Sequence, residues 1–198
     1  MSAKRYPMEP VTYQIRVLLR DSHPAIWRRI LVRSDLTLRG LHQVLQTTMG
    51  WRNSHFHQFT FRGKYYGRPD PEGELKTIDD AKARIEDVVT GKGQCLKYEY
   101  DLGDSWEHFL TIEKVMPLDE DKPPALCLAG ERACPPEDVG GTPGYEEFLE
   151  AVRHPNHKDH KDMIRWAGGA FDSEAFDLSQ VNRQLQKTVR KPRGKAAA

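Results

Sequence analysis

The stretch Tyr98–Phe109, with the sequence YEYDLGDSWEHF, decides the fold because it carries two alternating segments around one glycine-containing turn. Tyr98 and Tyr100 alternate with polar residues before the turn, and Trp106 and His108 do so after it. Alternation with a period of two is typical of strands that bury one face. The stretch therefore predicts a β-hairpin, and the length of its loop decides which residues oppose one another.

A two-residue loop in this hairpin would place apolar side chains opposite polar ones. A three-residue loop, residues 103–105, pairs Leu102 with Trp106 and Tyr100 with His108, so that one face is almost wholly apolar. Burying one large side chain contributes roughly 1.5–3 kcal/mol, which outweighs a turn preference of about 1 kcal/mol. We therefore predict the three-residue loop and interpret His108 as a core histidine rather than a catalytic base.

The same loop gathers carboxylates on the opposite face. Asp101 then lies across from Glu107, with Asp104 at the tip, and like charges in opposed positions require a positive partner. Three partners are compatible with the sequence: an arginine from the N-terminal third, solvent alone, or a divalent cation bound by Asp101, Asp104 and Glu107. These three carboxylates are the candidate metal ligands, and no other cofactor and no catalytic residue is predicted.

The segments around this hairpin predict further regular elements. Residues 12–20 and 26–33 alternate as two strands, and leucines at helical spacing after residue 37 predict a helix that Asp35 or Thr37 caps and Gly50 ends. Residues 55–67 return to strand character, and residues 77–89 predict a short helix. The proline- and glycine-rich residues 116–145 predict a long irregular loop. Three helical patterns follow from residue 144 onward, and Asn156 and then Asp172 or Ser173 cap the second and third of them.

This order of elements predicts an α+β fold rather than alternating βαβ units. An N-terminal hairpin followed by a crossing helix and more strands is similar to a ubiquitin-like β-grasp with a mixed sheet, to which C-terminal helices are added. We expect residues 1–186 to form one domain and residues 187–198, KTVRKPRGKAAA, to form a flexible basic tail.

Charge is distributed unevenly along the chain. Residues 1–68 hold 12 Lys and Arg against 3 Asp and Glu, whereas residues 69–186 hold 13 against 26. The charges of the basic segment and of the acidic segment either neutralise each other within the fold, or the basic segment leaves a face that binds nucleic acid. For the second case we name Arg16, Arg20, Arg28 and Arg29 as candidate contacts.

The N-terminus has no apolar run of the length that a signal peptide or membrane span needs, so we expect a cytoplasmic protein without a membrane partner. The three cysteines are too few for a disulfide framework and are interpreted as reduced thiols. Cys127 and Cys134 are compatible with a zinc site completed by His55, His57 or His108, but their spacing is not that of common zinc sites, and we interpret them as buried or free thiols. His157 and His160 also permit metal binding, but an exposed helix start accounts for them.

Five motifs in order, PAIWRRILV, GWRNSHFHQF, YEYDLGDSWEH, CLAGERACPPEDVGG and GYEEFLEAV, resemble those of the plasmid pRiA4b Orf-3-like family. The resemblance covers residues 13–185 and implies one compact α+β domain. It also implies an association with mobile elements, since members are often labelled as resolvases or passenger proteins. The chain departs from the family pattern at Val139, where a cysteine is common, and at Ser105, where a glycine is common.

Recombinase chemistry is not supported by the residues themselves. Leu18 stands where a serine resolvase needs its nucleophile, and no histidine is followed three residues later by arginine, as a tyrosine recombinase requires. We therefore expect a non-enzymatic module that binds nucleic acid or a protein partner. The alternative is a metal-dependent hydrolase or nuclease with Asp101, Asp104 and Glu107 on the metal and His108 as acid or base.

Overall fold

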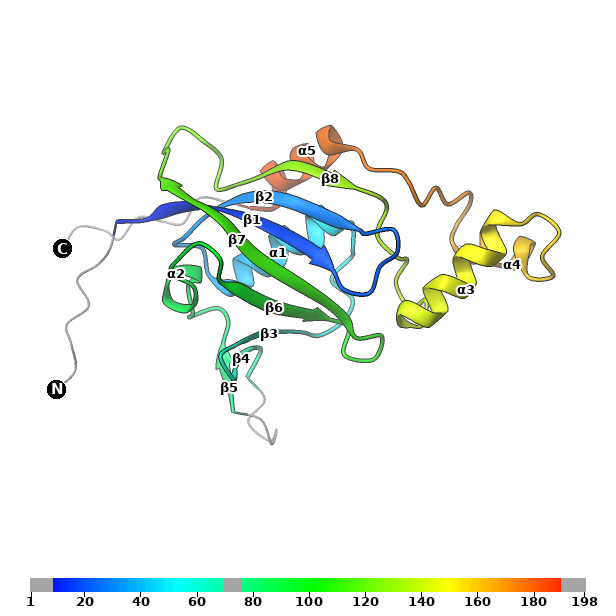
Figure 1. Ribbon diagram of the computed structural model, residues 1–198, viewed down its shortest axis with the longest axis horizontal. Helices are drawn as coiled ribbons and strands as arrows, with labels where there is room; N and C mark the ends of the chain where they lie inside the picture. The colour runs from blue at the N-terminus through cyan, green and yellow to red at the C-terminus, as the bar shows by residue number, and fades with distance from the viewer. Residues whose placement is uncertain (1–8, 70–75, 190–198) are drawn as a thin grey trace.

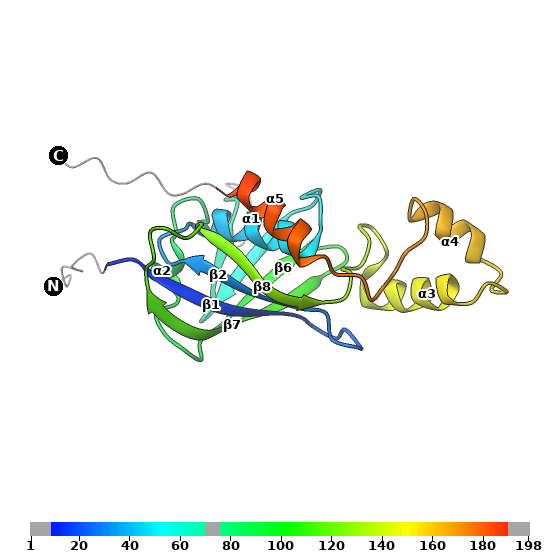
Figure 2. The same ribbon diagram turned by 90° about the horizontal axis from the view of Figure 1, so that it is seen from above.

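The computed structural model describes residues 9–69 and 76–189. A single eight-stranded sheet runs through them, α1 and α5 cover one face of it, and α3 and α4 extend from one end (Figures 1 and 2). The other face carries no helix in either view. The α+β class is therefore confirmed, whereas the likeness to a β-grasp stays an interpretation of the element order.

The N-terminal hairpin and its crossing helix are as predicted. They comprise β1 (Val11–Leu19), β2 (Trp27–Arg33) and α1 (Leu38–Met49). Thr37 caps the helix, because its hydroxyl accepts a hydrogen bond of 3.1 Å from the amide of Gly40. Gly50 ends the helix with a φ of 101°, a left-handed conformation that glycine adopts without strain.

The remaining strands extend the sheet on both sides of this hairpin. They are β3 (His57–Phe61), β4 (Lys64–Gly67), β5 (Thr77–Asp79), β6 (Cys95–Tyr100), β7 (Trp106–Pro117) and β8 (Ala125–Glu131). The strand order is β5-β4-β3-β6-β7-β1-β2-β8. All neighbours in it pair antiparallel except β4 and β5, so the sheet is mixed, as predicted.

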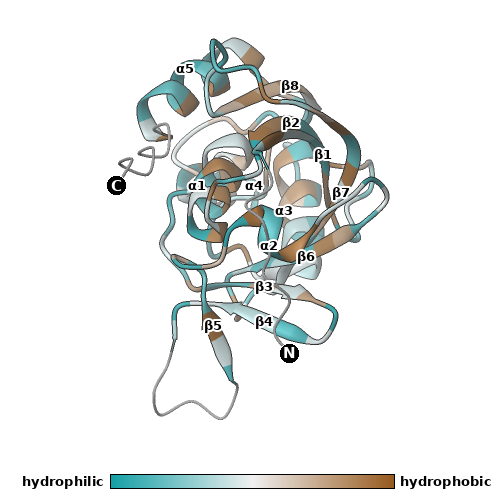
Figure 3. Cartoon of the chain, turned by 90° about the vertical axis from the view of Figure 1, so that its left-hand side faces the viewer, coloured by the Kyte–Doolittle hydropathy of each residue, from teal (hydrophilic) through white to brown (hydrophobic). Residues whose placement is uncertain are grey.

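Four helices accompany α1. They are α2 (Ile85–Val88), α3 (Gly141–Arg153), α4 (His160–Trp166) and α5 (Leu178–Thr188). The apolar face of α1, which includes Leu38, Leu41, Val44 and Leu45, is fully buried in the same core as the inward side chains of the sheet. In Figure 3, α1 and the central strands carry much of the brown colouring, whereas α5 is mostly hydrophilic.

Several predicted boundaries are wrong. Residues 77–89 form a short strand and a four-residue helix rather than one helix, because Thr77–Asp79 pairs with the edge of the sheet. The loop predicted over residues 116–145 contains β8, which pairs with β2 along its length. Helix α5 begins after Asp177, whose carboxylate accepts from the amide of Gln180 at 2.8 Å, and not at residue 172.

The expected basic tail also begins later than predicted. Helix α5 continues through Lys187 to Thr188, and Val189 is buried. Residues 190–198 lie outside the described residues, so the rest of this prediction is not tested. Every helix in residues 9–69 and 76–189 is too short or too polar to cross a bilayer.

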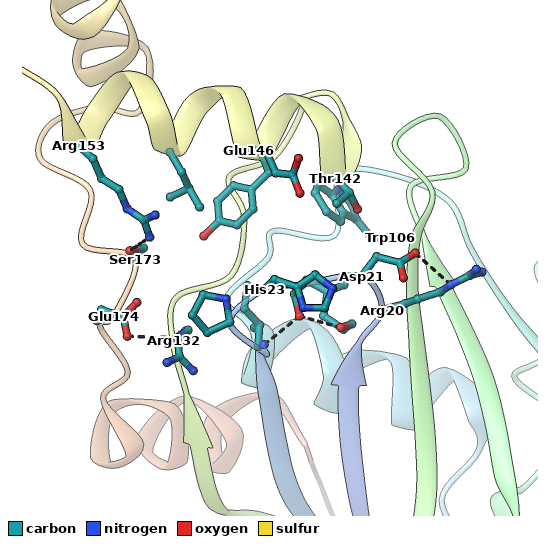
Figure 4. Close-up of a pocket in the computed structure, with 16 residues that line it drawn as sticks. Arg20, Asp21, His23, Trp106, Arg132, Thr142, Glu146, Arg153, Ser173 and Glu174 are labelled. Atoms are coloured by element: carbon teal, nitrogen blue, oxygen red, sulfur yellow. Dashed lines mark hydrogen bonds and ion pairs between the residues drawn. The ribbon is translucent and has the colours of Figure 1, made fainter. Parts of the chain in front are cut away.

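Helix α3 lies beside the turn between β1 and β2, and a small cavity separates them (Figure 4). Arg153 of α3 donates to Ser173 at 3.2 Å, and Arg132 pairs with Glu174 at 3.1 Å. The cavity has a volume of about 30 Å³, which is room for one or two water molecules and not for an organic ligand. It is a packing defect rather than a binding site.

Candidate metal centre

The hairpin that decides the fold has the predicted faces but a different register. Tyr100 pairs with Trp106 and Glu99 with Glu107, so five residues, 101–105, connect β6 to β7. This register is shifted by two residues from the predicted one, and a shift of two keeps the side chains of the two strands on their predicted faces. Trp106 is accordingly buried, and His108 lies in the core opposite Tyr98 rather than Tyr100. Asp101 and Leu102 were predicted to lie within the paired strands, but they belong to the loop, where Asp101 is buried and Leu102 is exposed.

The register separates the three carboxylates that were predicted to form one cluster. Glu107 lies opposite Glu99, and its carboxylate binds Arg20 at 2.5 Å and also Lys97. Hydrogen bonds from Lys97 and then Arg20 lower the pKa of Glu107. An arginine from the N-terminal third, Arg20, therefore supplies the expected positive partner. The carboxylates that oppose each other there are Glu107 and Glu99, and not Glu107 and Asp101 as predicted.

Asp104 and Asp101 turn to other partners. Asp104 accepts a hydrogen bond of 3.0 Å from the amide of Gly140. Asp101 has a φ of 55°, is 8% exposed and accepts from the amide of Gly103 at 3.0 Å, so its side chain points into the turn and away from Glu107. The structure does not bring Asp101, Asp104 and Glu107 into one metal site, because the longer loop turns Asp101 inward.

The structure brings Asp101 together with His55 and Asp138 instead. One ligand atom of each lies within 4.8 Å of the others, and this is the one such group of three that the described residues contain. Nε2 of His55 lies 3.0 Å from Asp138, 3.5 Å from Asp101 and 3.8 Å from Glu137. This nitrogen is shielded from solvent yet makes no hydrogen bond. The oxygens therefore lie beside the ring nitrogen rather than along the direction in which it would donate or accept.

These separations match those between ligands of a common ion. Nitrogen and oxygen ligands about 2.0–2.2 Å from a metal lie about 2.8–3.6 Å from one another in octahedral or tetrahedral geometry. A set that mixes imidazole with carboxylates suits Zn²⁺ or Mn²⁺ better than Ca²⁺, which prefers oxygen ligands alone. Glu137, 3.8 Å from His55, lies just beyond this range and outside the group of three.

Backbone contacts hold the two loops that carry His55 and Asp101 side by side. The amide of Asp101 donates to the carbonyl of Phe56 at 2.9 Å, next to His55. The hydroxyl of Tyr100 accepts from the amide of Ser54 at 2.9 Å. The end of β6 and the segment before β3 are therefore joined at the point where the two ligands emerge.

Glu137 holds the third segment against the other two. Its carboxylate accepts from the amide of Arg52 at 2.8 Å and from the hydroxyl of Tyr100 at 3.1 Å. Burial raises the pKa of Tyr100 above its ordinary value, so this hydroxyl stays protonated and donates. The contacts position Asp138, the next residue, at His55.

A pocket of about 690 Å³ adjoins the centre, within the range of small-molecule sites. His55 and Asp101 form one wall of it. The residues farther from the centre are Arg39, His42, His57, Arg68 and Asp80. Phe56 and Leu102 also line this pocket. The candidate metal centre therefore opens onto a volume that a substrate can fill.

A buried carboxylate orients one histidine in this pocket. Asp80 is fully buried and lies 2.9 Å from Nε2 of His57 and 2.7 Å from Arg39. Burial alone would raise the pKa of Asp80, but hydrogen bonds from His57 and Arg39 lower it. The ring of His42 stacks on His57 at 3.6 Å, and burial lowers the pKa of His42 to about 4, so His42 stays neutral at pH 7. This arrangement fixes the orientation of His57, as a base in a catalytic site requires.

The four arginines predicted to contact nucleic acid differ in their surroundings. Arg28 is 1% exposed and cannot reach a nucleic acid, because its place in β2 points it into the core. Arg20 pairs with Glu107, and Arg29 pairs with Glu113 at 2.7 Å, lowering the pKa of Glu113 to about 2. Arg16 is exposed in β1 and lies on the face of the sheet that α1 and α5 do not cover (Figure 2), called the open face below. Charge neutralisation within the fold therefore explains two of the four.

The zinc alternative is not supported by the described residues. Cys127 and Cys134 belong to no group of three ligands there, and neither do His157 and His160. Burial raises the pKa of Cys127 to about 11, which keeps its thiol protonated. Sequence reasoning missed the His55–Asp101–Asp138 group, although the motifs HFH, YDLGD and PPED each carry one member.

Comparisons with known proteins agree with the architecture. The family model for plasmid pRiA4b ORF-3-like proteins matches residues 11–180. An uncharacterized protein, y4hQ of Sinorhizobium fredii (strain NBRC 101917 / NGR234), is 39% identical over 188 residues, which cover 92% of this chain and 96% of that protein. The crystal structure of a protein of unknown function, MM3350 from Methanosarcina mazei Go1, is similar with a TM-score of 0.80 and 32% identity, covering 87% of this chain and 97% of that one.

Proposed function

The chain belongs to the plasmid pRiA4b ORF-3-like family, and we propose that it is a divalent-cation-dependent hydrolase whose cation is held by His55, Asp101 and Asp138. The observation that supports this proposal is the convergence of three ligand atoms from three separate segments, two of which, those of His55 and Asp101, carry residues that line a pocket. The sequence-based ligand set Asp101, Asp104 and Glu107 is replaced, and only Asp101 is kept.

The surroundings supply what hydrolysis needs. A cation bound there would polarise a substrate oxygen and lower the pKa of a coordinated water. His57, oriented by the buried Asp80, lines the same pocket and would accept or return the proton. His108 has no part in this scheme, because it lies in the core.

Cation binding is tested by titrating metal-stripped protein with Mn²⁺ and Zn²⁺ in a calorimeter. We expect one ion per chain, and at least a tenfold loss of affinity in His55→Ala and Asp138→Asn. Glu107→Gln is the matched control, since it removes a carboxylate of the replaced ligand set and should leave the affinity unchanged. Equal losses in Glu107→Gln and His55→Ala would contradict the proposed centre.

The proposed hydrolytic activity is tested separately from cation binding. Cation-loaded protein is assayed with chromogenic phosphate and carboxylate esters, and His57→Gln should lower turnover without lowering cation affinity. A protein that binds the cation but cleaves none of these esters at any pH would be a cation-binding protein and not the proposed hydrolase.

Nucleic-acid binding is a second candidate, which a feature of the open sheet face favours. Trp27 lies there between two arginines, with the guanidinium of Arg16 6.0 Å and that of Arg29 5.4 Å from its ring. An aromatic ring among cations is a platform on which unpaired bases can stack. Such binding should weaken steeply with salt and be lost in Arg16→Glu, but not in Arg62→Glu, when anisotropy of labelled single-stranded DNA is measured.

A further inference from the structure

The rim of the pocket beside the candidate centre carries two unusually exposed apolar side chains. Phe56 is 68% exposed and Leu102 is 53% exposed, the two highest values among large apolar residues in the described chain. Each follows a candidate ligand directly, Phe56 after His55 and Leu102 after Asp101. The hydrogen bond from the amide of Asp101 to the carbonyl of Phe56 joins their two loops.

Single exposed apolar residues are common and need no explanation. Here each loop turns a ligand inward and an apolar side chain outward, and both apolar side chains line one pocket. A molecule in this pocket that contacts His55 and Asp101 therefore also has Phe56 and Leu102 within the lining around it. Its own apolar part would remove their surface from water, which favours binding.

Cationic donors lie elsewhere in the same pocket. Arg39 and Arg68 line it, and Arg39 keeps about half of its side chain exposed despite its pairing with Asp80. Arg68 is exposed and forms no ion pair with the described residues. A neutral carbonyl group has no charge to pair with these two guanidinium groups, whereas the several oxygens of a phosphoryl group can accept from both of them and bind the cation as well.

We infer that this pocket binds a phosphate ester with an apolar substituent: the cation and the arginine side take the phosphoryl group, and Phe56 and Leu102 take the aryl or alkyl group. The inference rests on the proposed function, because it names the substrate class of that centre. It assigns no role in the chemistry to Phe56 or Leu102, which contact only the substituent.

Two phosphonates that cannot be hydrolysed as esters provide the test. Phenylphosphonate and methylphosphonate share the anionic group and differ in the size of the apolar group. Each is titrated by calorimetry into wild-type protein carrying stoichiometric Mn²⁺, after cation binding has been measured separately. We expect phenylphosphonate to bind about tenfold more tightly, as for an aromatic contact worth more than about 1 kcal/mol.

Substitutions then show which residues contact the apolar group of the ligand and which contact its phosphonate group. Phe56→Ala should weaken phenylphosphonate about fivefold or more and leave methylphosphonate unchanged, as expected for one lost aromatic contact. Arg68→Gln should weaken both ligands. Phe109→Ala is the matched control, since it removes a partly exposed phenylalanine on the open face of the sheet and should affect neither.

Each contrary result has a definite meaning. Equal affinities of the two phosphonates for the wild type, or equal losses in Phe56→Ala, would overturn the inference. Benzyl alcohol binding as tightly as phenylphosphonate would overturn its anionic half. If the protein binds no cation but still prefers phenylphosphonate in a Phe56-dependent way, the proposed function fails and the pocket's preference stands.

Discussion

At the scale of single residues, Arg28 is an unusual buried cation. Its guanidinium is 1% exposed and has only carbonyl acceptors among its hydrogen-bond partners, each within 2.8 Å. The acceptors belong to Trp27, Thr48, Glu131 and Arg132. The ring of Phe176 lies 4.2 Å from the guanidinium and covers it. Arg28 therefore connects β2, the end of α1 and the end of β8 through their backbones.

Replacement of Arg28 should destabilise the protein strongly. Arg28→Met leaves several buried carbonyls unsatisfied, so we expect the free energy of unfolding to fall by more than about 3 kcal/mol. Arg16→Met on the open face should change it by less than about 0.5 kcal/mol. Urea unfolding of the two variants measures the difference, and similar values for both would mean that the carbonyl contacts contribute little.

His108 makes stability depend on pH. Burial lowers its pKa from the ordinary 6.5 to about 4, and neither ring nitrogen makes a hydrogen bond. Between pH 6.5 and 4 the unfolded chain binds a proton at this residue that the folded chain does not, so stability falls as the pH falls through this window. The slope is up to about 1.4 kcal/mol per pH unit for one such group.

The contribution of His108 can be isolated by substitution. We expect His108→Leu to show a smaller loss of unfolding free energy between pH 7 and pH 5 than the wild type. His42, whose pKa burial also lowers to about 4, keeps part of the slope in the variant. Urea unfolding at both pH values is the measurement, and an unchanged slope would show that His108 does not titrate in this range.

At the scale of elements, the loop between β6 and β7 combines strain with precise placement. Asp101 and Ser105 both have a φ of 55°, and the amide of Ser105 donates to the carbonyl of Asp101 at 2.6 Å. A residue with a side chain loses roughly 1–2 kcal/mol in this conformation, whereas glycine does not. At Asp101 the strained conformation directs the carboxylate toward His55.

Ser105 has the same strained backbone conformation as Asp101, but its side chain is not a candidate ligand. Ser105→Gly should raise the unfolding free energy by about 0.5 kcal/mol, because the relief of strain exceeds the loss of an exposed 2.9 Å hydrogen bond to Glu99. Ser105→Ala loses that bond and keeps the strain, so it should be slightly less stable than the wild type. Thermal and urea unfolding test the order Gly above Ser above Ala, and a destabilised glycine variant would contradict it.

Local patterns predicted individual elements better than their connections. Alternation identified the hairpin faces, because burial of Tyr98, Tyr100 and Trp106 depends only on parity. The loop length escaped prediction, since registers two residues apart bury the same faces. β8 was missed because its flanks are rich in proline and glycine, and its strand form depends on pairing with β2, which local sequence does not reveal.

At the scale of the whole molecule, the candidate centre depends on contacts between distant segments. His55, Asp101 and Asp138 lie more than 35 residues from one another in the sequence and are brought together by the tertiary structure. Each taken alone is an ordinary loop residue, so composition and spacing offered no sign of the group. The cluster predicted from spacing used carboxylates from one hairpin, and the strand register placed these on different sides.

A contact between two loop tips holds the segment that carries Asp138 against the hairpin. Asp104 of the hairpin binds the amide of Gly140, and Gly141 lies against the same tip with a φ of 67°. A Cβ at Gly141 would lie 2.7 Å from the carbonyl oxygen of Asp104, closer than atoms can approach. Only glycine therefore lets the segment that carries Asp138 close onto the hairpin.

Gly141→Ala should consequently weaken cation binding while the protein stays folded. The added methyl group moves the segment away from Asp104 and carries Asp138 from His55, so we expect at least a tenfold loss of Mn²⁺ affinity in calorimetry. Gly63→Ala is the matched control, because Gly63 has a similar φ of 73° but open space around its Cβ position. Both variants should lose about 1 kcal/mol of unfolding free energy through backbone strain, and only Gly141→Ala should lose the cation. Equal cation affinities in the two variants would show that Asp138 reaches the centre without this contact.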